Sequence, residues 1–181
     1  MAKKEGADFQ LIIIRFLHER LLYRLSVSDY SQQFILEGGA FIYAMQGLKS
    51  RPTLDVDLLG TQISNDIDVL CEVFRQICII QSEDEVSFNP ESIVGELITK
   101  QGKYNGIRLY INATFHTVRQ RIQIDVGFGD IVIPDVQELV YPILLDDMQV
   151  PFLQAYSKET VIAEKFQAML ELSVVNSRMK D

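Results

Sequence analysis

The feature that most constrains the fold of this chain is the stretch from Leu54 to Leu58, in which apolar residues alternate with aspartates. Successive side chains of a β-strand point to opposite faces of a sheet, so Asp55 and Asp57 share one face and Val56 lies on the other. The stretch therefore predicts a strand with one face in a core and a second face that carries carboxylates.

The segments before this strand are predicted to alternate helix, strand and helix. A helix is expected from Phe9 to Leu25, with Asp8 as its N-cap. Its apolar positions recur at three- and four-residue steps and are Ile14, Leu17, Leu21 and Leu25. A strand at residues 34–36 then leads through Gly38 and Gly39 into a short helix that Gly47 closes.

The segments after the aspartate strand are predicted to form a helix, a hairpin and a further strand. A helix capped by Asn65 is expected to run to about Ile79. Asn105-Gly106 is a typical two-residue hairpin turn, and the residues that follow it alternate. In a strand from 121 to 128, Asp125 points away from the apolar face.

The last quarter of the chain is predicted to divide at residue 157. Residues 130–156 contain three prolines among short apolar pieces, which indicates an irregular connector over the core. Ser157 is then expected to cap a helix. We predict a core over residues 1–156 and the start of a C-terminal helical region over residues 157–181.

The composition limits the classes of partner. The chain has 25 acidic and 17 basic residues and a formal net charge of −8, so any contact with nucleic acid must be local. No apolar stretch approaches the ~20 residues of a membrane span, and we predict a cytoplasmic protein without a membrane partner. Cys71 and Cys78 are interpreted as small buried residues of one helix, not as a disulfide.

The aspartate pair is the strongest candidate for a chemical site. Side chains at i and i+2 on a strand lie about 6.6 Å apart, close enough to bracket one or two divalent cations. Mg²⁺ prefers carboxylate oxygens and relieves the repulsion between Asp55 and Asp57. The spacing alone is more typical of the solvated face of an edge strand, so the surrounding residues decide between these explanations.

Several of those residues favour a nucleotide site. The turn at Gly38 and Gly39 presents backbone N–H groups and a helix N-terminus, which bind anions, although it is also an ordinary glycine turn. If its strand lies beside the aspartate strand, Asp125 can join the pair as a metal ligand or as a base. Arg51 and Thr53 are suitably placed to contact phosphate.

Lys165 is a further candidate because of its place in the predicted C-terminal helix. Its neighbours at three and four residues are all apolar, namely Val161, Ile162, Ala168 and Met169. An ammonium group in such surroundings either reaches past the core margin to water or binds a partner such as phosphate. His18 and His116 lack a second ligand at metal-binding spacing, and we interpret both as structural or surface residues.

Taken together, the ordered motifs resemble the AbiEii/AbiGii toxin family of nucleotidyltransferases. They are Leu36-Glu37-Gly38-Gly39, Arg51-Pro52-Thr53-Leu54-Asp55-Val56-Asp57-Leu58, Ile124-Asp125-Val126, Ala163-Glu164-Lys165 and Arg178-Met179-Lys180-Asp181. The resemblance implies an α/β fold with a mixed sheet, the polymerase-β-like nucleotidyltransferase core, with flanking helices. It also implies that the C-terminal helical part continues beyond Asp181.

The resemblance implies roles for individual residues. The predicted metal ligands are Asp55, Asp57 and Asp125, and the predicted catalytic set adds Lys165 and Asp181 to them. The predicted nucleotide-binding residues are Gly38, Gly39, Arg51 and Thr53. The sequence departs from the family at Glu37, where many members have a lysine, and this places a negative charge near the expected triphosphate.

The function implied by the resemblance is transfer of a nucleotidyl group from an NTP to a hydroxyl of an RNA, such as tRNA, or of a protein. It would use Mg²⁺ or Mn²⁺ and belong to a toxin–antitoxin or phage-defence system with a cognate antitoxin. Two alternatives remain open. The first is a catalytically impaired nucleotide-binding module of the same fold. The second interprets residues 55–61 as the phosphatase loop of a haloacid-dehalogenase-like hydrolase.

Overall fold

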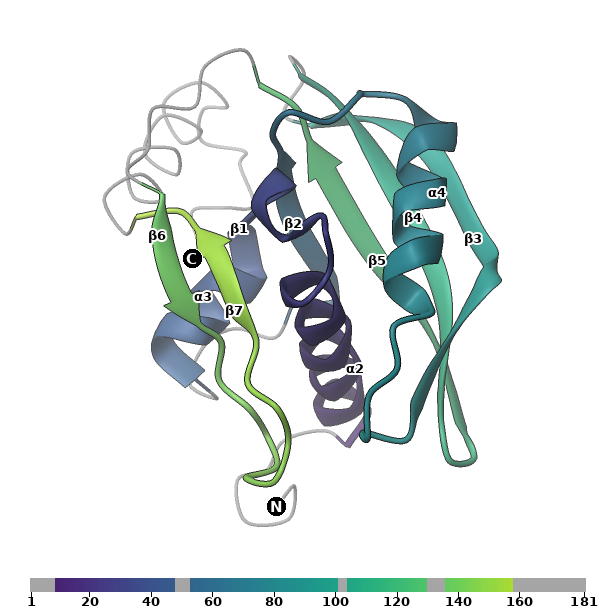
Figure 1. The fold of residues 1–181 in the computed structure, drawn as a ribbon, viewed down its shortest axis with the longest axis vertical. Helices are drawn as coiled ribbons and strands as arrows, with labels where there is room; N and C mark the ends of the chain where they lie inside the picture. The colour runs from purple at the N-terminus through teal and green to yellow at the C-terminus, as the bar shows by residue number, and fades with distance from the viewer. Residues whose placement is uncertain (1–8, 48–52, 101–103, 130–135, 158–181) are drawn as a thin grey trace, which may run out of the picture.

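The computed structural model describes residues 9–47, 53–100, 104–129 and 136–157, which form a seven-stranded mixed sheet with helices (Figure 1). The helices are α2 (Phe9–Ser26), α3 (Gly38–Gln46) and α4 (Ile67–Cys78), with a 3-10 turn η1 (Ser31–Gln33). The strands are β1 (Phe34–Glu37), β2 (Asp55–Gly60), β3 (Val86–Lys100), β4 (Tyr104–Phe115), β5 (Val118–Gly127), β6 (Gln137–Val140) and β7 (Phe152–Ala155). The predicted mixed α/β fold is confirmed.

The strand order β3-β4-β5-β2-β1-β7-β6 places the aspartate strand in the middle of the sheet. β2 pairs antiparallel with β1 and parallel with β5, and β7 pairs parallel with β1. A parallel pair needs a long crossover, and the segment between β2 and β5 supplies it with α4 and the β3–β4 hairpin. The strands predicted around residues 34–36, 54–58 and 121–128 are confirmed.

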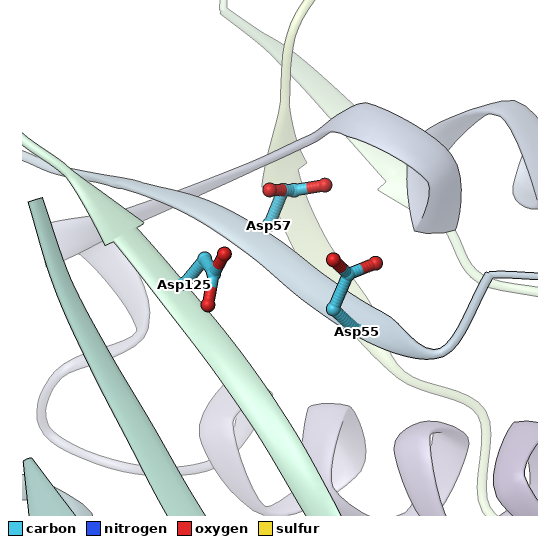
Figure 2. A group of neighbouring side chains, drawn as sticks. All are labelled: Asp55, Asp57 and Asp125. Atoms are coloured by element: carbon cyan, nitrogen blue, oxygen red, sulfur yellow. The ribbon is translucent and has the colours of Figure 1, made fainter. Parts of the chain in front are cut away.

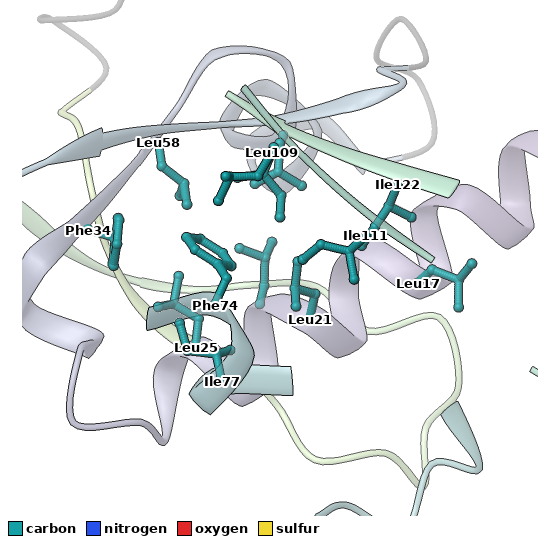
Figure 3. Packing of buried hydrophobic residues seen from close by; sticks show 14 of the residues in the cluster. Leu17, Leu21, Leu25, Phe34, Leu58, Phe74, Ile77, Leu109, Ile111 and Ile122 are labelled. Carbon is teal, nitrogen blue, oxygen red and sulfur yellow. The ribbon is translucent and has the colours of Figure 1, made fainter. Parts of the chain in front are cut away.

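One face of the sheet carries the core. Figure 3 shows Leu17, Leu21 and Leu25 of α2 and Phe74 and Ile77 of α4 packed against apolar side chains of the strands. Phe34 of β1 meets the Phe74 ring edge to face, with centroids 5.5 Å apart. Burial of these side chains fixes which face of each strand points inward.

The predicted helix ends at Gly47 and at about Ile79 are confirmed, one predicted N-cap is shifted, and the N-cap predicted at Asp8 lies outside the described residues. Gly47 caps α3 with φ +63°, a backbone conformation that favours glycine. α4 is capped by Asp66, not by Asn65 as predicted, because Asp66 accepts a hydrogen bond from the Val69 N–H at 3.0 Å. That bond needs an N-cap three residues before its donor.

The hairpin predicted after residue 93 is confirmed, but its turn is not at Asn105-Gly106. These two residues lie inside β4, opposite Thr99 and Ile98, and the intervening residues 101–103 are outside the described part of the chain. A Cβ at Gly106 would lie 2.9 Å from the Val126 carbonyl oxygen. The glycine therefore allows close strand approach instead of forming the turn.

A second hairpin joins β4 to β5 through His116 and Thr117. His116 has φ +50°, as the first residue of a tight hairpin turn requires. Its exposed imidazole lies 2.9 Å from Glu85, whereas His18 is buried in α2, where burial lowers its pKa to about 4. The structural or surface roles predicted for the two histidines fit these positions.

The prediction of an irregular connector over residues 130–156 is wrong in part, because β6 and β7 lie within it. The loop between these strands covers the outer side of α2. The Leu144 N–H donates to Glu19, and Arg20 donates to the Gln149 carbonyl, both at 2.8 Å. Helix α2 is therefore buried on two sides and lacks the solvated face that the three- and four-residue spacing of its apolar positions indicates.

The cysteines and the helices can be compared with the sequence predictions. Cys71 and Cys78 are both free and buried in α4, as predicted, and burial raises the pKa of the Cys78 thiol to about 12. None of the helices in the described ranges combines the length and the apolar character needed to cross a bilayer.

A buried ion pair ties α2 to the segment that leads into β3. Arg24 donates to both carboxylate oxygens of Asp84, at 2.7 and 2.9 Å, and also to the carbonyls of Ile80 and Val86. Burial would raise the pKa of Asp84, but its bonds to Arg24 and to the Val86 N–H outweigh burial and hold the pKa below its ordinary value. Removing one partner would leave the other charge buried without compensation.

We therefore expect Asp84→Ala to lower the free energy of unfolding by about 3–5 kcal/mol at neutral pH, measured by urea denaturation. Asp147→Ala, at an exposed position, serves as control and should change it by less than about 0.5 kcal/mol. A depressed folded-state pKa stabilises the protein above the ordinary aspartate pKa, so the difference should vanish as the pH falls through the folded-state pKa. A loss below about 1 kcal/mol at pH 7 would contradict this role.

Candidate functional site

Three carboxylates meet where β2 lies beside β5. Asp55 and Asp57 come from β2 and Asp125 from β5, and the register places Asp57 directly opposite Asp125 (Figure 2). One oxygen from each side chain lies within 4.8 Å of the other two. From the sequence, Asp125 joins the pair only if its strand lies beside the aspartate strand. The structure meets this condition, because β5 is the neighbour of β2.

The aspartates lie on the face of the sheet opposite the core. Val56, between the two aspartates of β2, is fully buried on the helix side, whereas Asp55 and Asp57 are only partly buried. Figure 2 shows the three carboxylates projecting from one side of the strands, and the start of α3 lies on that side beside Asp57. Asp125 is much more enclosed, with 4% of its surface exposed. Within the described part of the chain, the cluster is therefore reached from the face of the sheet opposite α2 and α4, the open face.

Electrostatics makes the bare cluster unfavourable. Burial raises the pKa of Asp55, and the charges of Asp57 and Asp125 raise it further, while a hydrogen bond from Thr53 opposes the shift. The Thr53 hydroxyl donates to Asp55 Oδ1 at 2.6 Å. A cation bound among these oxygens would remove the repulsion.

Asp125 is held by two residues that sequence reasoning did not select. Arg108 of β4 donates from Nε and NH2 to the two oxygens of Asp125, each at 2.8 Å, and Gln123 donates to Oδ1 at 3.1 Å. The bonds to Asp125 raise the pKa of Arg108, so the guanidinium stays charged. The feature that could have identified Arg108 as a partner of Asp125 is the tight turn at residues 116–117. That turn sets the register of β4 and β5, which places Arg108 opposite Asp125.

The glycine pair permits close contact between the start of α3 and the aspartate strand. Gly38 has φ +62°, and a Cβ there would overlap the carboxylate of Asp57. A Cβ at Gly39 would lie 2.5 Å from the Thr53 hydroxyl. The two glycines thus bring the N-terminus of α3 beside the carboxylates, where its N–H groups are suited to an anion.

Some of the remaining predicted site residues lie in the described part of the chain, and others do not. Glu37 ends β1 opposite Asp57, so its negative charge borders the cluster. Arg51, Lys165 and Asp181 lie outside the described residues, as does the C-terminal region predicted over residues 157–181 apart from Ser157, and their roles stay predictions. The phosphatase-loop alternative does not fit, because Asp55 and Asp57 lie within a central strand and not in the loop that follows one.

Comparison with known proteins agrees with this arrangement. A family model described as the nucleotidyl transferase AbiEii toxin of type IV toxin–antitoxin systems matches residues 20–181. No curated protein matches the chain with significance.

Two crystal structures from Helicobacter pylori share the fold. One is of a protein described as a candidate nucleotidyltransferase, with a TM-score of 0.51 and 15% identity over 88% of this chain. The other is of JHP933, with a TM-score of 0.50 and 13% identity over 87% of this chain. The match covers 59% and 56% of those two chains, so this chain spans less than two thirds of either.

The glycine pair generates a prediction with a matched control. Gly38→Ala and Gly47→Ala both force alanine into a positive φ, but a Cβ at Gly47 meets no atom within 4 Å. We expect Gly47→Ala to cost about 1 kcal/mol of unfolding free energy and Gly38→Ala at least about 2 kcal/mol more, measured by urea denaturation. Equal costs would show that Asp57 moves aside without penalty.

The repulsion among the carboxylates generates a second prediction. Because the folded-state pKa of Asp55 is raised, its ionised form opposes folding above that pKa. Asp55→Asn should therefore raise the metal-free unfolding free energy by about 1 kcal/mol at pH 8, and the gain should disappear at acidic pH. It should also abolish any increase in melting temperature caused by Mg²⁺. A variant that is less stable than the wild type at pH 8 without metal would contradict the prediction.

Proposed function

Because the chain belongs to the AbiEii nucleotidyltransferase toxin family, we propose that it transfers a nucleotidyl group from a nucleoside triphosphate to a hydroxyl of an RNA or a protein. The observation that carries this proposal is the convergence of Asp55, Asp57 and Asp125 within 4.8 Å on two neighbouring parallel strands. A solvated strand face would not require a third carboxylate from another strand, held in place by its own hydrogen bonds.

The side chains fit a divalent cation. Mg²⁺ and Mn²⁺ favour carboxylate oxygens, and the three aspartates offer one oxygen each within a space that such an ion fills. We propose Asp55 and Asp57 as its ligands throughout, and Asp125 as a third ligand until its one remaining lone pair takes up the proton of the acceptor hydroxyl. When bound, the ion would supply charge stabilisation to the phosphates of the nucleotide and to the attacking oxygen.

The transfer proceeds by substitution at the α-phosphorus of the nucleotide. The acceptor hydroxyl oxygen forms a bond to this phosphorus, and the bond to the bridging oxygen of the pyrophosphate breaks. Pyrophosphate leaves with that electron pair, and the hydroxyl proton passes to Asp125 as the base. Asp125 suits this role because it is the most enclosed of the three carboxylates and borders the open face of the sheet.

The residues around the cluster have supporting roles in this proposal. The N–H groups at the start of α3, freed by Gly38 and Gly39, bind the triphosphate. The Thr53 hydroxyl donates a hydrogen bond to Asp55, so Thr53 orients that carboxylate. Lys165, Arg51 and Asp181 are proposed, from the family resemblance, to complete the phosphate and catalytic contacts.

The proposal extends to the biological setting. Membership in a toxin family supports action as the toxin of a toxin–antitoxin or phage-defence system, with an antitoxin as partner and the cytoplasm as location. The chain spans less than two thirds of the two matched structures, so these roles are proposals that have to be tested on the full-length protein.

A second candidate is a nucleotide-binding module without turnover. Glu37 favours it, since its carboxylate lies opposite Asp57 and next to the start of α3, where it opposes a triphosphate. Titration calorimetry with each of ATP, GTP, CTP and UTP in Mg²⁺ separates the candidates. Metal-dependent binding without transfer supports the module, and absence of binding to all four rejects both.

The direct test incubates the protein with α-labelled NTPs, Mg²⁺, and separate RNA and protein fractions. We expect label to appear in one fraction, and Asp57→Asn to reduce the transfer rate at least about a hundredfold because a metal ligand is lost. Asp147→Asn removes the same charge at an exposed position in the loop between β6 and β7, and it should leave the transfer rate unchanged. No transfer to either fraction, or transfer that survives Asp57→Asn, would count against the proposal.

A further inference from the structure

A row of charged residues crosses the open face of the sheet through the aspartate cluster. The strand registers align Glu96 of β3, Arg108 of β4, Asp125 of β5, Asp57 of β2 and Glu37 of β1 in that order. Side chains paired in this way share one face of the sheet. Arg108 is the only cation of this row, and its guanidinium contacts the innermost carboxylate.

The hydrogen bonds leave Asp125 with one available oxygen. Oδ1 accepts from Arg108 Nε and from Gln123 Nε2, which together occupy the two lone pairs of that oxygen. Oδ2 accepts only from Arg108 NH2 among the contacts of the described residues, so one lone pair remains. Asp125 can therefore bind a cation or accept a proton through Oδ2.

The same contact sets the charge of the cluster. Three ionised aspartates carry three negative charges, and the guanidinium of Arg108 offsets one of them. Among the three aspartates and Arg108 two negative charges remain, which a single divalent ion balances, and Glu37 at the end of the row adds one further negative charge beside them. Arg108 is 30% exposed at its side chain, so its charge acts on an ion in the cluster partly through water.

We propose that Arg108 is a positioning residue that turns Oδ2 of Asp125 toward the other two aspartates and limits the nucleotide-free protein to one tightly held divalent ion. This inference rests on the proposed metal-dependent transfer. It assigns to Arg108 two effects of opposite sign. The guanidinium weakens cation binding by repulsion, and it supports transfer by fixing the direction of the base.

The opposite signs distinguish this role from a structural one. A residue that only stabilises the sheet would, when replaced, weaken cation binding and transfer together. Arg108→Gln should instead bind the cation more tightly while transferring more slowly. Arg108→Lys keeps the charge but loses the two-bond fork, so it should alter transfer and leave cation binding nearly unchanged.

The test measures Mn²⁺ binding to the whole chain without nucleotide, by electron paramagnetic resonance of the free ion. We expect one tight site in the wild type, about tenfold tighter binding for Arg108→Gln, and a change below about threefold for Arg108→Lys. Transfer should fall at least about tenfold in both variants. Melting without metal confirms that each variant is folded.

Arg121→Gln is the matched control. Arg121 lies on the same face of β5, stacked on Tyr110 with 3.9 Å between its guanidinium carbon and the ring centroid. It is four residues from Asp125, about 13 Å along the strand and beyond the Debye length of about 8 Å at physiological ionic strength. Its loss should change Mn²⁺ affinity less than about twofold.

Two results would overturn the inference in different ways. Wild-type binding of Mn²⁺ with unchanged or weaker binding in folded Arg108→Gln rejects the role of Arg108 and leaves the proposed function standing. No Mn²⁺ binding in the wild type rejects the metal site of the proposed function and the role of Arg108 with it.

Discussion

The parallel pairing of β2 with β5 is the constraint on which the rest of the structure depends. It places Asp57 opposite Asp125 and so creates a cluster that neither strand has alone. Parallel neighbours cannot be joined by a tight turn, so α4 and the β3–β4 hairpin fill the crossover between them. The same crossover covers the core face of the sheet with α4. It also adds β4 beside β5, and Arg108 of β4 reaches Asp125 on the opposite face.

The cluster is a local conflict that its neighbours reduce but do not remove. Arg108 and Gln123 hold Asp125, and Thr53 holds Asp55, yet the pKa of Asp55 stays raised because burial and the nearby carboxylates outweigh that hydrogen bond. Proteins retain such unfavourable arrangements at functional sites, where a ligand supplies the missing charge. The closeness of Gly38 to Asp57 belongs to the same design, because it admits the end of α3 to the site without a side chain between them.

The scaffold beneath the site is held by buried charges as well as by apolar packing. Arg24 and Asp84 join α2 to the start of β3, and Glu19 and Arg20 join it to the loop between β6 and β7. Such contacts are sensitive to geometry, since each buried charge must keep its partner. They fix α2 against the sheet from two sides, and a sheet fixed in this way can hold three repelling carboxylates at short distance.

The sequence by itself determined the local elements and the chemistry of their faces. Alternation around Asp55 and Asp57 predicted the strand and its carboxylate face, and Gly47 predicted the end of α3, because such signals lie within a few residues. Only the tertiary structure decided which strands are neighbours. It added β7 beside β1, assigned Gly106 to a strand, and placed Arg108 on Asp125. Register between distant segments depends on packing of the whole sheet, and a pattern along one segment does not contain it.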